Sequence, residues 1–361
     1  MSGDQGTECL TEISARQMEY VTRENLSARE AVAFLRSGMQ VRSFRDVLRQ
    51  VYGTDQVEQQ LTQALCRISG AAQPDSIRRK VWNWMNGRAM PTEREEVFRV
   101  CFALELRLEQ ADRMLTLLTE QGIHYRNLRE VVYAYCLRNG LPYGEAERLM
   151  VQLRPAEAQE QGFPATRAIR QDFQAVQAEE DLFSFIARHR QSLGTHHNTA
   201  YGYFCKMLAL LTGEALEGEQ TYSMEYVAEE YLRLNVPKGK KTSRYTDVQK
   251  LVKKNWPSPR SIKAMKSRSE DVDRKTLLLL YLVTEGTWGD EYDELDEAYI
   301  QPEEILVAHC HRMNQMLTDC GMRRIDPRSV FDYLLLYCLL PENDMAMSQR
   351  MAALASELFN E

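Results

Sequence analysis

The spacing of apolar residues along the chain predicts helices almost throughout. Apolar residues recur three or four positions apart, as in Val57, Leu61 and Leu65, which places them on one face of a helix. The alternation of apolar and polar residues that marks a half-buried strand is almost absent. Glycines and prolines separate the periodic segments, at Gly70, Pro74, Gly87, Pro91, Gly122, Gly140 and Pro142. We therefore expect an all-helical (all-α) fold.

One pattern of 26 residues occurs twice, at Asp112–Leu137 and Asn314–Leu339. The copies align without a gap and are identical at eight positions: Met114/Met316, Leu115/Leu317, Thr116/Thr318, Ile123/Ile325, Arg126/Arg328, Tyr135/Tyr337, Cys136/Cys338 and Leu137/Leu339. Two shorter matches precede them in the same order, Pro74–Ile77 with Pro259–Ile262 and Met85–Arg88 with Met265–Arg268. Three collinear matches predict an internal duplication, in which one helical unit is used twice.

The repeat predicts two related helical units joined by a helical connector. We expect the first unit at 1–155, the connector at 156–197 and the second unit at 198–361. The second copy gains 22 residues between Arg274 and Asn314, and this insertion contains the acidic run 290–297, which predicts a surface loop. Tyr135 and Tyr337 are interpreted as core residues. Arg126 and Arg328 are interpreted as structural.

Composition favours a globular protein without a membrane anchor. The chain has 361 residues, of which 44% are hydrophobic and 27% charged. No apolar run approaches the length that spans a bilayer, and the N-terminal residues lack the basic and apolar regions of a signal peptide. The eight cysteines are dispersed without a CxxC pair, which is typical of reduced thiols. We expect a cytoplasmic location and no membrane partner.

Charge is distributed unevenly along a chain whose net charge is −7. Between Lys238 and Arg268, eleven Lys and Arg stand against one acid, Asp247. A local basic stripe predicts contacts to nucleic-acid phosphates. The residues expected to make them are Lys240, Lys241, Lys250, Lys253, Lys254, Lys263, Lys266 and Arg268. Alternatively, the stripe neutralises the acidic run 290–297 in the same half of the chain. In the helix expected at 248–256, Val248, Leu251 and Val252 are predicted to point inward.

The segment from Leu65 to Leu115 has a characteristic order of helices and turns. One helix ends at Gly70, a second runs from Ser76 to Asn86 into a Gly87-Arg88-Ala-Met-Pro91 turn, and a third ends in Ala103-Leu104. This order resembles the lambda-repressor-like (Cro-type) helix-turn-helix over about 50 residues, and we expect the helix-turn-helix at about 57–118 within the first unit. The turn after Gly70 is one or two residues longer than is usual in that family. The resemblance implies that 76–86 is a DNA recognition helix.

The helix 76–86 has two chemically distinct faces. Ile77, Val81 and Trp84 form the stripe expected to pack inward. The opposite side carries the residues predicted to contact base edges, since Arg and Asn make bidentate contacts in the major groove: Arg78, Arg79, Asn83 and Asn86. Trp82 lies on the same side, and an exposed aromatic residue suits a protein contact at least as well.

The chain lacks the motifs that predict catalysis. His309-Cys310-His311 and Cys320 contain metal-binding residue types, but residues two apart on a helix point to nearly opposite sides. No nucleotide-binding fingerprint, GxSxG elbow or paired-carboxylate signature occurs. We expect no catalytic residue, no metal, no cofactor and no small-molecule substrate.

These features favour a non-catalytic DNA-binding regulatory protein of the helix-turn-helix type, acting in transcription regulation. Two alternatives stay open. The first is a protein-interaction adaptor or scaffold, in a defence or signalling operon, whose degenerate helix-turn-helix binds a protein partner or a second copy of the chain. The second is an RNA-binding protein, because a lysine stripe does not distinguish DNA from RNA.

Overall fold

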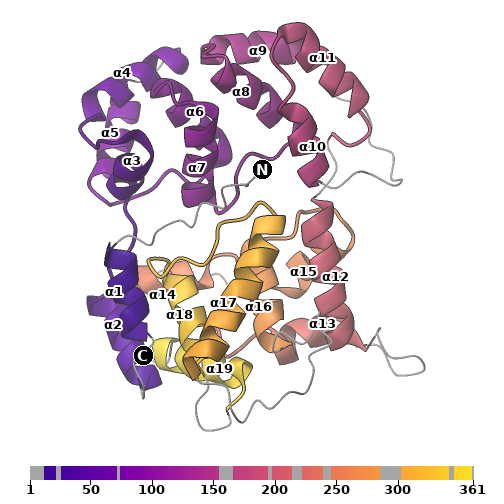
Figure 1. The fold of residues 1–361 in the computed structure, drawn as a ribbon. Coiled ribbons are helices and arrows are strands. Elements are labelled where there is room, and N and C mark those ends of the chain that lie inside the picture. The colour runs from indigo at the N-terminus through magenta and orange to yellow at the C-terminus, as the bar shows by residue number, and fades with distance from the viewer. Residues whose placement is uncertain are drawn as a thin grey trace. The chain divides into compact units, whose positions relative to one another are not determined.

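A computed structural model shows a chain built from helices (Figure 1). The residues that it describes are 12–21, 26–70, 74–153, 166–193, 197–213, 222–238, 245–284, 302–340 and 345–359. Within these ranges there is no strand, and the single β-bridge joins Gln121 and Met322. The all-helical expectation is confirmed. Within the same ranges, no helix has both the length and the apolar character needed to cross a bilayer.

The chain folds into two compact units, and neither is a continuous stretch. Unit I comprises residues 42–202 and 317–323. Unit II comprises residues 1–41, 203–316 and 324–361. The boundaries expected from the repeat, 1–155 and 198–361, were placed by sequence similarity. The units of the structure are defined instead by which segments pack together. Residues 1–41 accordingly lie in unit II, and the short segment 317–323 lies in unit I.

Unit I contains nine described helices. They are α3 (Phe44–Tyr52), α4 (Glu58–Ile68), α5 (Pro74–Met85), α6 (Arg94–Ala103), α7 (Leu108–Thr119), α8 (Leu128–Arg138), α9 (Tyr143–Gln152), α10 (Thr166–Phe173) and α11 (Glu179–Arg188). Helix α4 packs on α5 and α6, α3 packs on α7, and α8 packs on α9. Helix α3 begins where Ser43 and Asp46 exchange hydrogen bonds in a capping box, and ends at Gly53, whose φ of 91° suits glycine.

Helices α10 and α11 occupy the described part of the expected connector. A turn at 174–178 separates them. Phe173, Leu182 and Ile186 are buried in the same hydrophobic core as Phe44 and Leu61, so both helices belong to unit I. Their burial follows the apolar spacing that the sequence shows.

Unit II contains the remaining helices. They are α1 (Glu12–Val21), α2 (Ala28–Ser37), α12 (Asn198–Thr212, which begins in unit I), α13 (Met224–Tyr226), the π-helix η1 (Val227–Tyr231), α14 (Asp247–Lys253), α15 (Pro259–Lys266), α16 (Arg274–Val283), α17 (Pro302–Asp319), α18 (Val330–Cys338) and α19 (Met347–Phe359). Helices α16 and α18 are almost wholly buried, and α19 packs on α2, α16 and α18. Stacked rings of Tyr20, Phe34 and Tyr333 join α1, α2 and α18.

Helix α14 differs from its prediction in the face that it buries. Val252 is buried as expected, but Leu251 is 46% exposed and Gln249 points inward instead. The Gln249 side chain donates to the Leu358 carbonyl at 2.7 Å and accepts from the Thr246 backbone N–H at 2.8 Å. Both ends of the amide are therefore satisfied, which permits its burial. The prediction for Leu251 was wrong because capping and hydrogen bonding, rather than apolar spacing, orient this seven-residue helix.

Each unit contains an ion pair embedded in a similar polar network, and the pair is half-buried in unit I and fully buried in unit II. In unit I, Arg94 binds both carboxylate oxygens of Glu130 at 2.7 and 2.6 Å. In unit II, Arg274 binds both oxygens of Asp332 at 2.7 and 2.8 Å. Each arginine also donates to a loop carbonyl, that of Gly122 at 2.7 Å or Arg324 at 3.2 Å.

Backbone contacts around these two ion pairs also correspond. The His124 N–H donates to Glu130 at 2.8 Å, and the Asp326 N–H donates to Asp332 at 2.9 Å. In the preceding helices, Asp112 and Asn314 accept hydrogen bonds from the backbones of Ile123 and Ile325 at 2.7 and 2.8 Å. The loop before α8 and the loop before α18 thus have their polar groups paired in the same way.

The other residues that the repeat singled out are buried. Tyr135 and Tyr337 lie in the core, as expected. Arg126 and Arg328 are buried too, and the Arg328 guanidinium donates to the Gln40 carbonyl at 3.1 Å. Arg328 therefore ties the end of the N-terminal helical segment to the rest of unit II, a structural role.

Candidate nucleic-acid interface

Helix α5 packs against unit I through one apolar face. Val81, Trp84 and Met85 are buried, and Ile77 packs against the same core. Arg45 on α3 donates to the Met85 carbonyl at 2.5 Å, which satisfies a group at the C-terminal end of α5. The inward stripe that the helical spacing predicts is therefore the buried one, and most of the opposite stripe faces solvent.

The predicted base-contacting residues differ in how accessible they are. Arg78, Arg79 and Asn86 are exposed, whereas Asn83 is half-buried. Arg78 pairs with Asp75 at 3.2 Å, but both side chains are largely in solvent, so the pair contributes at most about 1 kcal/mol and exchanges readily. The Asn86 side chain donates to the Trp82 carbonyl at 2.8 Å, so part of its amide is engaged in ending the helix.

Trp82 and Arg88 form a flat exposed pair beside these residues. The guanidinium of Arg88 lies 4.4 Å from the centre of the Trp82 ring, and Trp82 is 40% exposed. Lys80, on the same helix, pairs with Glu96 of α6. Neither Arg88 nor Lys80 was among the predicted site residues, although the Gly87-Arg88 turn is visible in the sequence.

The basic stripe of unit II is largely paired with its own surroundings. Lys250 binds Asp247 at 3.0 Å, Lys253 lies 4.8 Å from the Tyr245 ring centre, and Lys263 binds Glu225. Lys254 is exposed, and Lys266 and Arg268 are half-buried. Lys240 and Lys241 lie outside the described residues, as does the acidic run 290–297, so the proposed neutralisation of the stripe by that run stays a prediction.

Lys275 is a further cation that sequence reasoning missed. It is buried, and its ammonium donates to the carbonyls of Val252 at 2.8 Å, Leu251 at 3.4 Å and Lys254. These carbonyls lie at the C-terminal end of α14, where a helix carries partial negative charge. Lys275 therefore fixes the helix that presents Lys250 and Lys253.

His309 and His311 lie on different sides of α17. His309 is buried and its Nδ1 lies 2.8 Å from the Tyr281 hydroxyl, whereas His311 is exposed. Among the described residues, no group of three or more His, Cys, Asp or Glu side chains is placed to hold a metal ion. Burial, and secondarily the charge of Arg312, lowers the pKa of His309 from 6.5 to about 4.

His309→Gln is expected to reduce the dependence of stability on pH. The folded state keeps His309 neutral while the unfolded chain takes up a proton below pH 6.5, so stability falls as pH falls from 6.5 towards 4. The expected loss between pH 7 and pH 4.5 is about 2–3 kcal/mol. Gln can still accept from Tyr281. Urea unfolding at both pH values tests this, and an equal loss in the variant and the parent would contradict it.

Comparison with known proteins leaves the geometry as the basis for assigning a function. No family model, no curated protein and no solved structure matches the chain.

Proposed function

We propose that unit I contains a helix-turn-helix module, with α4 and α5 as its two central helices, and that the chain is a non-catalytic DNA-binding regulatory protein. One observation carries this proposal: α5 buries Val81 and Trp84 against its own unit and leaves Arg78 and Arg79 in solvent. A recognition helix needs this division, because one face must be held rigidly while the other enters the major groove. Arginine is the side chain that most often contacts guanine there.

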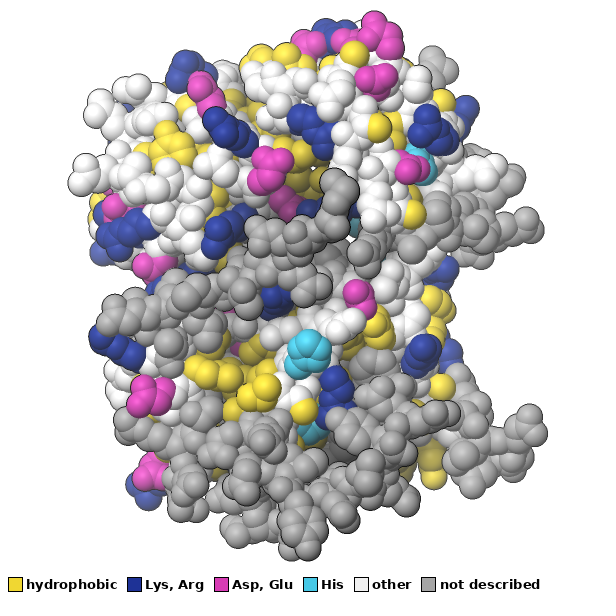
Figure 2. Space-filling model, in the orientation of Figure 1, with side chains coloured by type: hydrophobic (Ala, Val, Ile, Leu, Met, Phe, Trp, Pro, Cys, Tyr) yellow, Lys and Arg dark blue, Asp and Glu magenta, His cyan; other side chains and the backbone are white. Residues whose placement is uncertain are grey.

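Local charge supports α5 as the contacting element. From Pro74 to Arg88, four Lys and Arg stand against one acid, Asp75. On the face of the molecule in Figure 2, basic and acidic side chains are interspersed. A mixed surface of this kind attracts a phosphate backbone only weakly, so this face favours no contact over those of the α5 arginines.

We further propose that the two units arose by internal duplication. Arg94 and Arg274 each begin a ten-residue helix, α6 or α16, and each binds the acid on the third residue of α8 or α18. A left-handed residue follows α5 and α15, Gly87 with φ of 68° and Arg268 with φ of 57°. Because α15 has eight residues against twelve in α5, the second copy offers a shorter recognition-like helix. Its expected contribution is non-specific contact with phosphates.

Binding to labelled duplex DNA at 50–200 mM salt tests the proposed function. The affinity is expected to fall steeply with salt, because bound cations displace counterions from DNA. The double variant Arg78→Ala/Arg79→Ala is expected to bind about ten-fold or more weakly than the parent. Arg188→Ala, which removes an exposed arginine from α11, is the matched control and should bind normally. Absence of salt-sensitive duplex binding at low ionic strength would overturn the proposal.

One observation favours the second candidate function, a protein-interaction module. The exposed Trp82 with Arg88 stacked on it is the type of residue pair that dominates protein interfaces. For a protein-binding module, Trp82→Ala should remove a polypeptide that co-purifies from the host. For a DNA-binding protein, nucleic acid should co-purify, and Arg78→Ala/Arg79→Ala should reduce it more than Trp82→Ala does.

A further inference from the structure

Four hydrogen-bond donors from three helices of unit I surround one carboxylate, that of Glu95 on α6. The Tyr133 hydroxyl of α8 donates to both carboxylate oxygens, at 2.9 and 3.0 Å. The Tyr143 hydroxyl of α9 donates to Oε1 at 2.7 Å. The guanidinium groups of Arg99, one turn further along α6, and of Arg129 on α8 lie on the same carboxylate. These five residues, called the Glu95 cluster below, form an anion-binding arrangement that a side chain of the protein itself occupies.

The carboxylate of Glu95 does not satisfy all four donors. Arg99 Nε lies 3.5 Å from Oε1 and Arg129 Nη1 lies 3.8 Å from Oε2, whereas such hydrogen bonds span about 2.7–3.2 Å. Arg129 donates to the Tyr133 hydroxyl at 3.3 Å instead. Arg99 Nε is buried and has no hydrogen-bond partner among the residues that the structure describes. Two guanidinium charges also face one carboxylate charge. An anion with more oxygens and more charge therefore suits the cluster better than Glu95 does.

The two hydroxyls are held rigidly, whereas Glu95 is not. Tyr133 is fully buried and Tyr143 is 5% exposed. The Tyr133 ring lies 4.7 Å from that of Phe98, and the Tyr143 ring lies 5.5 Å from that of Phe102. Burial raises the pKa of Tyr133, so its hydroxyl stays protonated at neutral pH and donates. The Glu95 side chain is 38% exposed, so it can turn into water at little cost and leave the donors in place.

We propose that the Glu95 cluster is a binding site for a phosphate monoester, which displaces the Glu95 carboxylate. A phosphate monoester carries a charge of about −1.5 to −2 and three acceptor oxygens, which match two guanidinium groups and two hydroxyls. A phosphate of a nucleic-acid backbone is a diester with a single charge, so it has no such advantage over Glu95. The site shares no residue with α5 and therefore does not rest on duplex binding.

Three probes measure this site by calorimetry: glycerol 3-phosphate, a phosphoserine peptide and dimethyl phosphate. The first two are monoesters, one free and one attached to a polypeptide, and the third is a diester. The parent chain is expected to bind at least one monoester and to bind dimethyl phosphate about ten-fold or more weakly. Binding of glycerol 3-phosphate identifies a small phosphorylated molecule as the ligand, and binding of the peptide alone identifies a phosphorylated protein.

Three variants connect this binding to the cluster. Glu95→Gln removes the competing charge and is expected to strengthen monoester binding about ten-fold. Arg99→Gln is expected to weaken it about ten-fold, and Tyr143→Phe to weaken it several-fold, about three-fold or more. A network with only a structural role would lose stability in Glu95→Gln and gain no affinity. Urea unfolding of each variant shows that it is folded.

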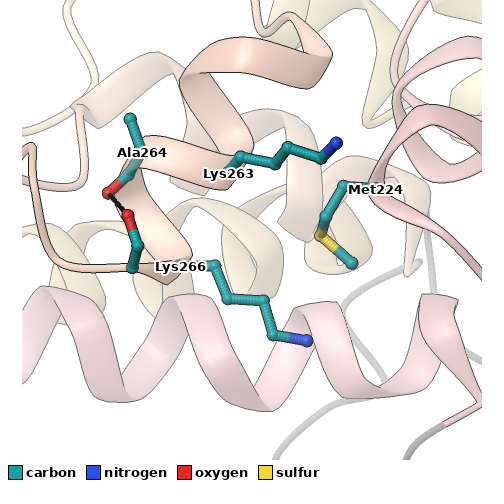
Figure 3. A pocket seen from close by; sticks show the side chains of 5 residues that line it. Met224, Lys263, Ala264 and Lys266 are labelled. Atoms are coloured by element: carbon teal, nitrogen blue, oxygen red, sulfur yellow. Dashed lines mark hydrogen bonds between the residues drawn. The ribbon is translucent and has the colours of Figure 1, made fainter.

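A lysine and glutamate pair in unit II provides a matched control. Lys263 binds the carboxylate of Glu225 beside an open depression that lies between α13 and α15. Lys263 and Lys266 extend from α15 with Met224 between their ends (Figure 3). No tyrosine hydroxyl is among the residues that line this depression. Glu225→Gln therefore frees a surface ammonium group without creating a framed site, and it should leave monoester affinity unchanged.

The double variant Arg78→Ala/Arg79→Ala should bind monoesters normally, so the failure of one proposal is distinguishable from the failure of the other. Four results would each overturn the phosphate site. These are absence of monoester binding, equal binding of dimethyl phosphate, equal affinities in Arg99→Gln and the parent, and an equal gain in Glu225→Gln and Glu95→Gln. Binding that occurs only in Glu95→Gln would overturn it as well, because the ligand would then not displace Glu95.

Discussion

Asp332→Ala is expected to destabilise unit II by about 3–5 kcal/mol. The substitution leaves the Arg274 guanidinium, only 2% exposed, without the carboxylate that it contacts at 2.7 and 2.8 Å. It also leaves the Asp326 N–H without its acceptor. Urea unfolding gives the loss in free energy. Hydrogen exchange shows where the stability is lost, because protection of backbone amides should fall in α16 and α18 and persist in unit I.

Unit I provides a matched comparison, Glu130→Ala. Its partner Arg94 is 29% exposed and also donates to Thr119 and to two carbonyls, so water and these groups compensate part of the lost pairing. The expected cost is therefore smaller, about 2–3 kcal/mol. Replacing both partners in unit II, by Arg274→Met/Asp332→Leu, should recover much of the loss because no uncompensated charge remains.

Equal losses in Asp332→Ala and in the double replacement would contradict the ion-pair explanation. The cost would then come from packing around α18 rather than from the stranded charge of Arg274. A loss in Glu130→Ala as large as that in Asp332→Ala would contradict the role given to solvent exposure.

Both arginines of these pairs stand out in the repeat, whereas a comparison of identical residues misses their acidic partners. Arg94 and Arg274 follow the Met-x-x-Arg matches at a constant distance. Glu130 and Asp332 occupy equivalent places in the 26-residue pattern, yet they differ in length by one methylene and so are not among the eight identities. The sign of the charge is shared where the residue type is not. A comparison of charge at each repeated position would have found the network.

Helical spacing predicted buried faces well in the longer helices. In α5, the inward stripe of Val81 and Trp84 follows directly from a period of 3.6. It failed in the seven-residue α14, where two turns give too few positions to define a face and the hydrogen bonds of Gln249 decide it. Lys275 was missed because it stands at the start of the apolar run Leu277–Leu280, and its partners are backbone carbonyls, which carry no sequence signal.

The sequence also does not show which segments of the chain make up each unit. Residues 1–41 precede the first copy of the repeat but pack in unit II, where Phe34 stacks on Tyr333 and the Arg36 guanidinium donates to the Leu358 carbonyl. Apolar spacing shows that α2 has a face to bury. It does not show which distant helix will cover that face, because any apolar surface of suitable shape can bury it.

Lys275→Met is expected to destabilise unit II by about 2–4 kcal/mol. Methionine fills a similar volume, so the change isolates the ammonium group. Its loss leaves the carbonyls at the end of α14 without their donor, the buried contact to Val252 among them. It also removes a cation 4.9 Å from the Phe331 ring centre and 5.9 Å from that of Trp256. Urea unfolding measures the change, and hydrogen exchange in α14 and α16 assigns it to unit II.

Lys254→Met is the control, because it removes an exposed lysine of the same helix end and should change stability by less than about 0.5 kcal/mol. Equal effects of the two variants would mean that Lys275 does not hold α14.

If Lys275→Met alone lowers stability, the consequence extends to function. Helix α14 packs on α18 and presents Lys250 and Lys253, so release of its C-terminal end should weaken the phosphate contacts that are proposed for these two lysines. A buried lysine would then act on nucleic-acid binding only by positioning the helix that carries the exposed ones.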